Sequence, residues 1–109
     1  MRHQRTPLRG QIWLADVGLD EAKRFVIVSN NVRNRKLNDL LGIRLTTAPK
    51  PDLPSIVAFG PGEVARSRCF AVADDIWPLA KVDLVRSVGA LTPRKMEAVQ
   101  RAIAAALDL

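Results

Sequence analysis

The chain has 109 residues and a mass of 12.0 kDa, a length that predicts one domain. It contains one histidine, His3, and one cysteine, Cys69, which excludes an intrachain disulfide and a structural zinc site made of His and Cys ligands. No apolar run approaches the roughly 18 residues of a transmembrane helix, and no apolar stretch follows the basic start as in a secretory signal. We therefore expect a cytoplasmic protein with no membrane segment, no metal site and no cofactor.

The positive charge is unevenly distributed. The chain has 17 basic and 11 acidic residues, a net charge of +6 and a pI of about 10.5. Residues 1–50 hold ten basic and four acidic side chains, whereas residues 51–109 hold seven of each. Clustered positive charge is typical of proteins that bind a polyanion such as a nucleic acid, although charge that only aids solubility remains the alternative.

Taken in chain order, the pattern predicts a short flexible basic tail over residues 1–8 and a single domain over residues 9–109. Runs rich in β-branched and aromatic residues predict several short strands. The polar segment 30–39 fits a short helix or a long turn, and prolines make 48–54 a loop. The expected strands are 10–17, 25–28, 41–46, 56–59, 69–76 and 86–91, and the run 25–28 is apolar enough to be covered on both faces.

The C-terminal segment is predicted to be a helix. Thr92 is a good N-cap and Pro93 suits the first helical position. Apolar residues then recur at three- and four-residue spacing, which predicts a face packed on the core: Met96, Val99, Ile103, Ala106 and Leu107. Strands followed by one helix indicate a mainly β (α+β) fold, a small and strongly bent sheet or barrel.

Two residues form the candidate catalytic pair. Arg24 is expected at the mouth of the second strand and Thr46 near the end of the third, so both can lie on one rim. A guanidinium can bind a phosphate bidentately, and a hydroxyl can bind a non-bridging oxygen. No metal is required if the attacking group is the 2'-hydroxyl of RNA. The alternative is that Arg24 is a surface residue and Thr46 merely suits a strand.

Other residues are candidates for RNA contact. Asn side chains bind base edges, and Arg stacks on bases as well as pairing with phosphate. A capped, solvated turn is the alternative for the basic segment between the second and third strands. The candidates in and around that segment are Lys23, Asn30, Asn31, Arg33, Asn34, Arg35 and Thr47.

Two aspartates, two tryptophans and the cysteine are the remaining residues considered for the site. Asp74 and Asp75 are adjacent on a strand, so they point to opposite faces and do not converge on one ion. One of them, Asp74, is a candidate for the RNA site, and Trp77, placed before Pro78 in an expected loop, is a candidate stacking platform. Trp13 and Cys69 are expected in the core.

The order of these features resembles the MazF/PemK family of toxin endoribonucleases. The matching segments are RGQIWLADVG (9–18), KRFVIVSNN (23–31), IRLTT (43–47), the Ala73-Asp74 strand end and RSVGALT (86–92), which together span roughly residues 9–109. Each segment alone is weak, and their order and spacing carry the resemblance.

The resemblance implies an SH3-like β-barrel with a C-terminal helix, forming a homodimer. It implies cleavage of single-stranded RNA without a metal, leaving a 2',3'-cyclic phosphate and a 5'-hydroxyl. It assigns proton donation or transition-state stabilisation to Arg24, and a phosphate contact to Thr46. The implied partner is an acidic antitoxin whose extended tail occupies the RNA groove, which suits a basic toxin.

The chain departs from the family pattern at several positions. Phe25 follows Arg24 where proline is usual, the turn 19–23 is short, and Val72 stands where some members have an arginine. Two other functions remain open at this point. One is a protein-directed gyrase poison of the same fold, although the chain lacks the C-terminal tryptophan that such toxins use, and the other is a β-barrel that binds RNA without cutting it.

Overall fold

The computed structural model describes residues 6–109; residues 1–5, including His3 and most of the predicted tail, lie outside the described residues. Residues 6–8 differ from the flexible tail expected there, because Pro7 is buried and the Leu8 amide donates to Gln11 Oε1 at 2.9 Å. The elements are β1 (Gln11–Ala15), β2 (Lys23–Ile27), α1 (Asn31–Lys36), β3 (Asp39–Thr46), β4 (Ile56–Phe59), β5 (Cys69–Ala80), the 3-10 helix η1 (Lys81–Asp83), β6 (Leu84–Ala90) and α2 (Pro93–Leu107).

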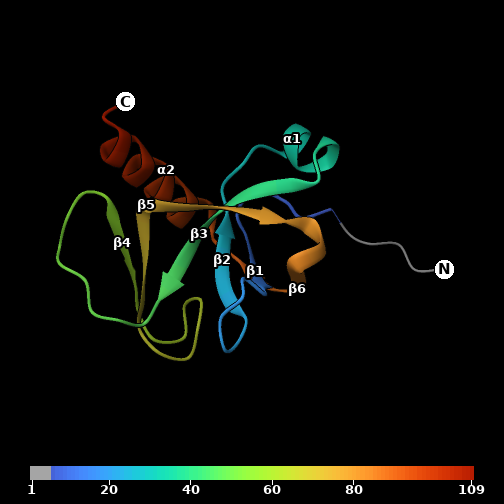
Figure 1. Cartoon of the computed structure of the whole chain (residues 1–109). Helices are drawn as coiled ribbons and strands as arrows, with labels where there is room; N and C mark the ends of the chain where they lie inside the picture. Colours follow the sequence, from blue (N-terminus) through green and yellow to red (C-terminus); the bar gives the residue numbers. More distant parts are fainter. Residues whose placement is uncertain (1–5) are drawn as a thin grey trace.

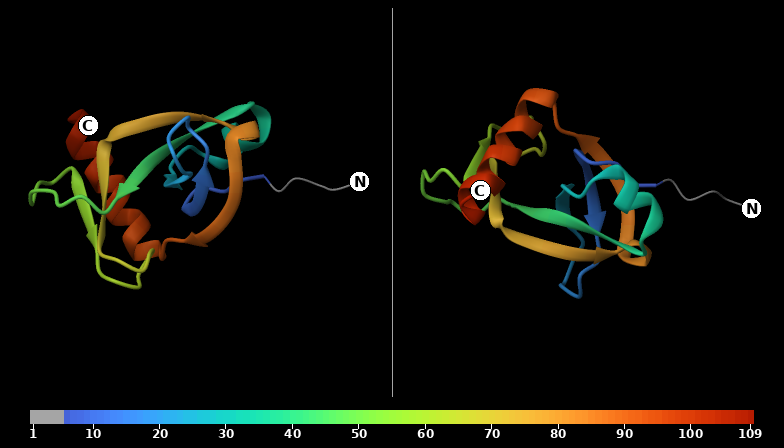
Figure 2. Two further views of the ribbon diagram at one scale, coloured as in Figure 1. Left: turned by 60° about the horizontal axis from the view of Figure 1, so that its bottom comes forward. Right: turned by 90° about the horizontal axis from the view of Figure 1, so that it is seen from above.

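The six strands form one antiparallel sheet in the order β4-β5-β3-β2-β1-β6. The sheet curls strongly, and α2 lies across its open side against β4 and β5 (Figures 1 and 2). The expected mainly β fold with a bent sheet and a C-terminal helix is therefore confirmed. Hydrogen bonding does not close the sheet, since β4 and β6 remain its two edges.

Two apolar clusters form on the two faces of the sheet. Val26 of β2 and Val28, just after the strand, join the larger cluster, which also takes in Val99 and Ala102 of α2. Phe25 and Ile27 point the other way into a smaller cluster. The apolar run 25–28 is thus covered on both faces, as its composition predicts. Successive side chains along β2 point alternately to the two faces of the sheet.

Gly42 of β3 lets the smaller cluster pack closely. A Cβ atom at this position would lie 2.7 Å from Leu79 Cδ1 and 3.1 Å from Phe25 Cβ. These contacts are too short for a Cβ atom, so the side chains of Leu79 and Phe25 pack this closely over β3 only because residue 42 has no side chain.

The start of α2 is as predicted. The Thr92 hydroxyl accepts a hydrogen bond from the Lys95 amide at 3.2 Å, and Pro93 occupies the first turn. Val99 is fully buried, and Met96, Ile103 and Ala106 pack against the same cluster. The prediction that Leu107 belongs to this face is wrong, because the residue is 53% exposed in the last turn.

Strand β5 is longer than predicted. It continues through Trp77 and Pro78 to Ala80, so the expectation of a loop at these residues is wrong. Proline is tolerated because β4 pairs with β5 only as far as Val72, which leaves the outer edge of the later part of β5 unpaired. None of the helices within residues 6–109 is long and apolar enough to cross a membrane.

Candidate functional site

The start of β2 and the end of β3 meet at one rim of the sheet. The strands are antiparallel and Phe25 pairs with Arg44, which brings Arg24 and Thr46 to the same end, as the sequence predicts. A cavity of about 180 Å³ opens here. Its lining residues are Glu21, Ala22, Lys23, Arg24, Arg44, Leu45, Thr46, Thr47, Ala65 and Cys69.

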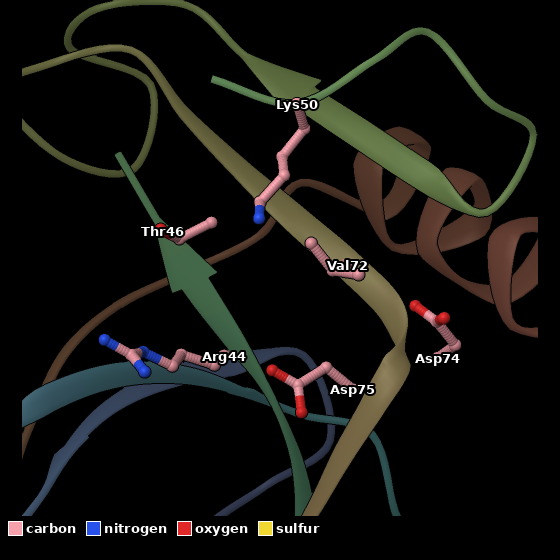
Figure 3. Close-up of a pocket in the computed structure, with 6 residues that line it drawn as sticks. All are labelled: Arg44, Thr46, Lys50, Val72, Asp74 and Asp75. Atoms are coloured by element: carbon pink, nitrogen blue, oxygen red, sulfur yellow. The ribbon is translucent and has the colours of Figure 1, made fainter. Parts of the chain in front are cut away.

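A second cavity of about 410 Å³ lies beside the first, between β3 and β5. It is lined by Arg44, Thr46, Lys50, Val72, Asp74 and Asp75 (Figure 3). Arg44 and Thr46 line both cavities, so the two form a continuous path around the end of β3. We call this path the rim groove, and Lys23, Arg24, Arg44 and Lys50 the rim cations.

A break in the register of β5 shapes the groove. Ile43 pairs with Ile76 and Leu45 with Ala71, so residues 72–75 of β5 stand opposite Arg44 alone. The strand bends there, and Figure 3 shows the carboxylates of Asp74 and Asp75 directed apart from that bend. Asp74 therefore lines the groove as expected, and the two carboxylates do not converge.

The rim cations come from both faces of the sheet. Val26 and Ile43 form one register pair, and both point into the larger cluster. By alternation, Arg24 and Leu45 share that face, whereas Arg44 and Thr46 share the other. Arg24 and Thr46 thus reach the same cavity from opposite sides of the sheet edge.

Arg44 and Lys50 are the two groove cations that sequence reasoning missed as site residues. The alternating pattern of residues 41–46 placed Arg44 off the core, which is correct, but assigned it to solvent. The Arg44 Nε atom is instead buried and has no hydrogen-bond partner within residues 6–109. Lys50 follows Thr46 by four residues in a proline-rich loop. The short distance in sequence between this cation and the candidate threonine could have identified Lys50 as a site residue.

Cys69 lies at the floor of the smaller cavity and is buried, as expected. Burial raises the pKa of the Cys69 thiol, and the nearby Arg24 guanidinium partly opposes that rise. The electrostatic effect of Arg24 on this thiol is consistent with its side chain lying on the Cys69 face of the sheet.

Trp77 is partly buried and packs edge to face on Phe25, with ring centroids 5.5 Å apart. Its indole Nε1 donates to Asp75 Oδ1 at 2.9 Å. Trp77 is therefore held on the groove side of β5 by packing and a hydrogen bond, and it is not among the residues that line either cavity.

The basic segment around α1 lies away from the rim. It leaves from the far end of β2 and returns at the start of β3, seven residues of extended strand from Thr46 (Figure 1). At about 3.3 Å per residue, this separates α1 from the rim groove by roughly 20 Å along β3. Arg35 and Asn30 are exposed there, and the structure does not bring the α1 candidates together with Arg24 and Thr46.

Most polar side chains of this segment have partners inside the protein. The Asn30 side chain caps α1 by accepting from the Arg33 amide at 2.8 Å, and Asn31 Oδ1 accepts from the Arg9 amide at 2.7 Å. Arg33 forms an ion pair with Asp39 at 3.0 Å. The interpretation as a capped turn fits these residues.

Asn34 is wholly buried, so the expectation that it contacts RNA is not supported by its position. Its side-chain amide donates to the Ser29 carbonyl oxygen at 3.0 Å, and its Oδ1 accepts from the Ser29 hydroxyl. The Ser29 hydroxyl in turn accepts from the Leu41 amide at 3.0 Å. Asn34 thereby ties α1 to the ends of β2 and β3.

Residues 8–107 match the family described as PemK-like, MazF-like toxins of type II toxin–antitoxin systems. The chain belongs to this family. The matched span includes all the residues that line the rim groove.

Named relatives support the assignment. The chain is 41% identical to Endoribonuclease MazF4 of Mycobacterium tuberculosis and to Endoribonuclease MazF1 of Mycobacterium bovis, in each case over 103 residues and 94% of both chains. A solved mycobacterial endoribonuclease in complex with its cognate antitoxin has 41% identity and a TM-score of 0.83, covering 94% of this chain and 96% of that one. A MazE–MazF structure from Deinococcus radiodurans, at 15% identity and a TM-score of 0.79 over 97% of this chain and 99% of that one, shows the shared fold.

Proposed function

We propose that this chain is the endoribonuclease toxin of a type II toxin–antitoxin system and that it cleaves single-stranded RNA in the rim groove, inhibiting translation and growth. The observation that carries the proposal is the meeting of Arg24 and Thr46 on one cavity, in a chain that belongs to the MazF-like family. The 41% identity to endoribonucleases over 94% of both chains supports it.

The chemistry we propose is an internal transfer at phosphorus. The 2'-oxygen of one nucleotide bonds to the adjacent phosphorus and loses its proton, while the bond from phosphorus to the 5'-oxygen breaks and that oxygen gains a proton. The products are a 2',3'-cyclic phosphate and a 5'-hydroxyl. Negative charge builds on the non-bridging oxygens, and Arg24 donates hydrogen bonds to them while the Thr46 hydroxyl orients one of them. These side chains supply the positive charge and hydrogen bonds without a metal ion.

Flanking nucleotides extend along the groove. Lys23 and Thr47 line the smaller cavity, whereas Lys50 and Asp74 line the larger one. The lysines bind phosphates, and a carboxylate accepts hydrogen bonds from amino groups on base edges. Asp74 thus offers a contact that distinguishes bases, and Trp77 on the same strand stabilises this wall of the groove.

The partner that we propose for the toxin is an acidic antitoxin. The net charge of +6 favours an acidic partner, and the rim cations offer its carboxylates the same contacts that RNA phosphates would make. Such a partner blocks cleavage by competing for the groove. We further propose a cytoplasmic homodimer, for which the exposed apolar residues Val82 and Val85, next to and on the edge strand β6, offer a contact surface.

The test is a mixed-sequence RNA incubated with the purified protein in excess EDTA, with the ends of the fragments chemically typed. We expect discrete fragments whose 5'-hydroxyl ends accept a phosphate label directly and whose other ends are cyclic phosphates. Arg24→Ala and Thr46→Val should abolish these fragments, whereas Thr46→Ser, which keeps the hydroxyl, should retain cleavage.

Two controls make the outcome decisive. Arg101→Ala removes the same charge from an exposed position on α2 and should cleave at the parental rate. Intact RNA across many sequences would overturn the proposal. In that case, tight salt-dependent binding would identify an RNA-binding module, and inhibition of gyrase supercoiling would identify a protein-directed toxin.

A further inference from the structure

We propose that Arg44 is a further catalytic residue, which binds the scissile phosphate beside Thr46 and stabilises the charge that develops on it. The inference rests on the proposed RNA cleavage and adds a residue that sequence analysis assigned to solvent. Three observations carry it: the position of Arg44, its buried Nε atom without a hydrogen-bond partner among residues 6–109, and the shape of the strand that faces it.

The first observation is position. Arg44 and Thr46 are two residues apart on β3 and therefore point to the same face of the sheet. Both line both cavities of the rim groove, which no other residue does. A phosphate that accepts a hydrogen bond from the Thr46 hydroxyl thus lies on the face from which the Arg44 side chain projects. Arg24 approaches from the opposite face, so the two arginines flank the phosphate instead of duplicating each other.

The second observation is the state of the guanidinium. Arg44 is partly buried, and its Nε atom is buried without a hydrogen-bond partner within residues 6–109. No carboxylate in this part of the chain forms an ion pair with it. A buried donor on a charged group is costly when unpaired, and such groups are usually satisfied by a partner or a ligand. By contrast, Arg33 at the other end of the sheet pairs with Asp39 at 3.0 Å.

The third observation is the opposing strand. Residues 72–75 of β5 bend away opposite Arg44, which opens the larger cavity beside its side chain. Asp75 lines the same cavity, but its Oδ1 accepts from the Trp77 indole at 2.9 Å. This bond holds the Asp75 carboxylate on β5. Figure 3 shows the Arg44 guanidinium extending away from that carboxylate, so it stays available to an anion that enters the groove.

The step that Arg44 assists involves no bond to Arg44 itself. Its N–H groups donate to the non-bridging oxygens as the 2'-oxygen bonds to phosphorus and the bond to the 5'-oxygen breaks. A planar guanidinium can donate two parallel hydrogen bonds to a phosphate, whereas a lysine acts as a single point charge. The planar geometry of the guanidinium, referred to below as the guanidinium fork, is therefore as important as its charge.

The experiment compares Arg44→Ala, Arg44→Lys and Arg101→Ala with the parent in single-turnover cleavage of the RNA identified above. We expect a loss of about 100-fold or more in the cleavage rate of Arg44→Ala, as for removal of a donor to a developing oxyanion. Arg44→Lys should recover only a small part of the rate, and Arg101→Ala should match the parent. Millimolar guanidinium ion should partly restore Arg44→Ala, which a merely structural role would not allow.

The results separate this inference from the proposed function. If the parent leaves RNA intact, the proposed function fails; if the parent cuts and Arg44→Ala cuts within about threefold of it, only this inference fails. Binding of an RNA with a 2'-O-methyl group at the cleavage position should weaken far less than the rate falls. If Arg44→Ala does not fold, Arg44→Lys decides the matter, and a folded Arg44→Lys with the parental rate would overturn the role of the guanidinium fork.

Discussion

Replacement of Asn34 by alanine tests whether the α1 segment stabilises the fold or contacts RNA. The side chain is fully buried, donates to the Ser29 carbonyl oxygen at 3.0 Å and accepts from the Ser29 hydroxyl. Its amide also lies 3.4 Å from Asn31 Oδ1. Asn34→Ala removes all three contacts and leaves the Ser29 carbonyl oxygen in the interior without this donor.

The expected magnitude follows from these contacts. A buried polar group left without its partner costs about 1–3 kcal/mol, and the lost acceptor of the Ser29 hydroxyl adds to this. We therefore expect the free energy of unfolding to fall by about 2–4 kcal/mol. For a domain of this size, roughly 4–6 °C is lost per kcal/mol, so the melting temperature should fall by about 8–24 °C.

The assay is urea unfolding at one fixed protein concentration, followed by circular dichroism, with Asn38→Ala as the matched control. Asn38 is exposed, and its backbone carbonyl accepts a hydrogen bond from the Lys81 amide at 2.9 Å, which the substitution leaves in place. Its replacement should change the free energy of unfolding by less than about 0.5 kcal/mol. Asn34→Ala with a parental urea midpoint and slowed RNA cleavage would refute the reasoning and would identify Asn34 as an RNA contact.

Three further predictions concern the core, the thiol and the rim cations. Gly42→Ala should lower the free energy of unfolding by about 1–3 kcal/mol, because the new methyl would lie 2.7 Å from Leu79 Cδ1; urea unfolding measures it, and an unchanged midpoint would contradict the close approach. Burial raises the pKa of the Cys69 thiol above its ordinary value of 9.0, so the folded state holds the proton more tightly than the unfolded state. Stability should therefore decline above about pH 9 more steeply in the parent than in Cys69→Ala, and parallel pH profiles would contradict this. If all four rim cations contact phosphates, a plot of the logarithm of RNA affinity against the logarithm of salt concentration should have a slope of about −3. A slope near zero would show that the rim cations do not bind RNA phosphates.

Local pattern predicted the strands and the terminal helix because each depends on residues close in sequence. The run 25–28 is apolar at every position; residues 25–27 lie in β2, and the run is covered on both faces. Thr92 and Pro93 mark the start of α2 through the capping geometry that their chemistry favours. The end of that helix was less predictable, because Leu107 fits the apolar spacing but is exposed in the last turn of α2.

The features that the sequence did not predict depend on contacts between distant segments. Pro78 indicated a loop, yet it lies in a strand whose outer edge is unpaired at that point. Arg44 was correctly placed off the core, but whether that face meets solvent or a groove depends on the bend of β5 at residues 72–75. No local pattern in residues 41–46 contains that information.

Arg33, in α1 before the start of β3, and Arg44, near the end of β3, differ in the partners of their guanidinium groups. In α1, Arg33 pairs with Asp39 at 3.0 Å. At the rim, Lys23 pairs with Glu21 at 3.7 Å, whereas the Nε atom of Arg44 is buried without a hydrogen-bond partner among residues 6–109. Arg33 and Arg44 are the same residue type, and only their partners differ. The donor of Arg44 that is unsatisfied among the described residues, on the same face as Thr46, therefore supports the proposal that phosphate binds at the rim.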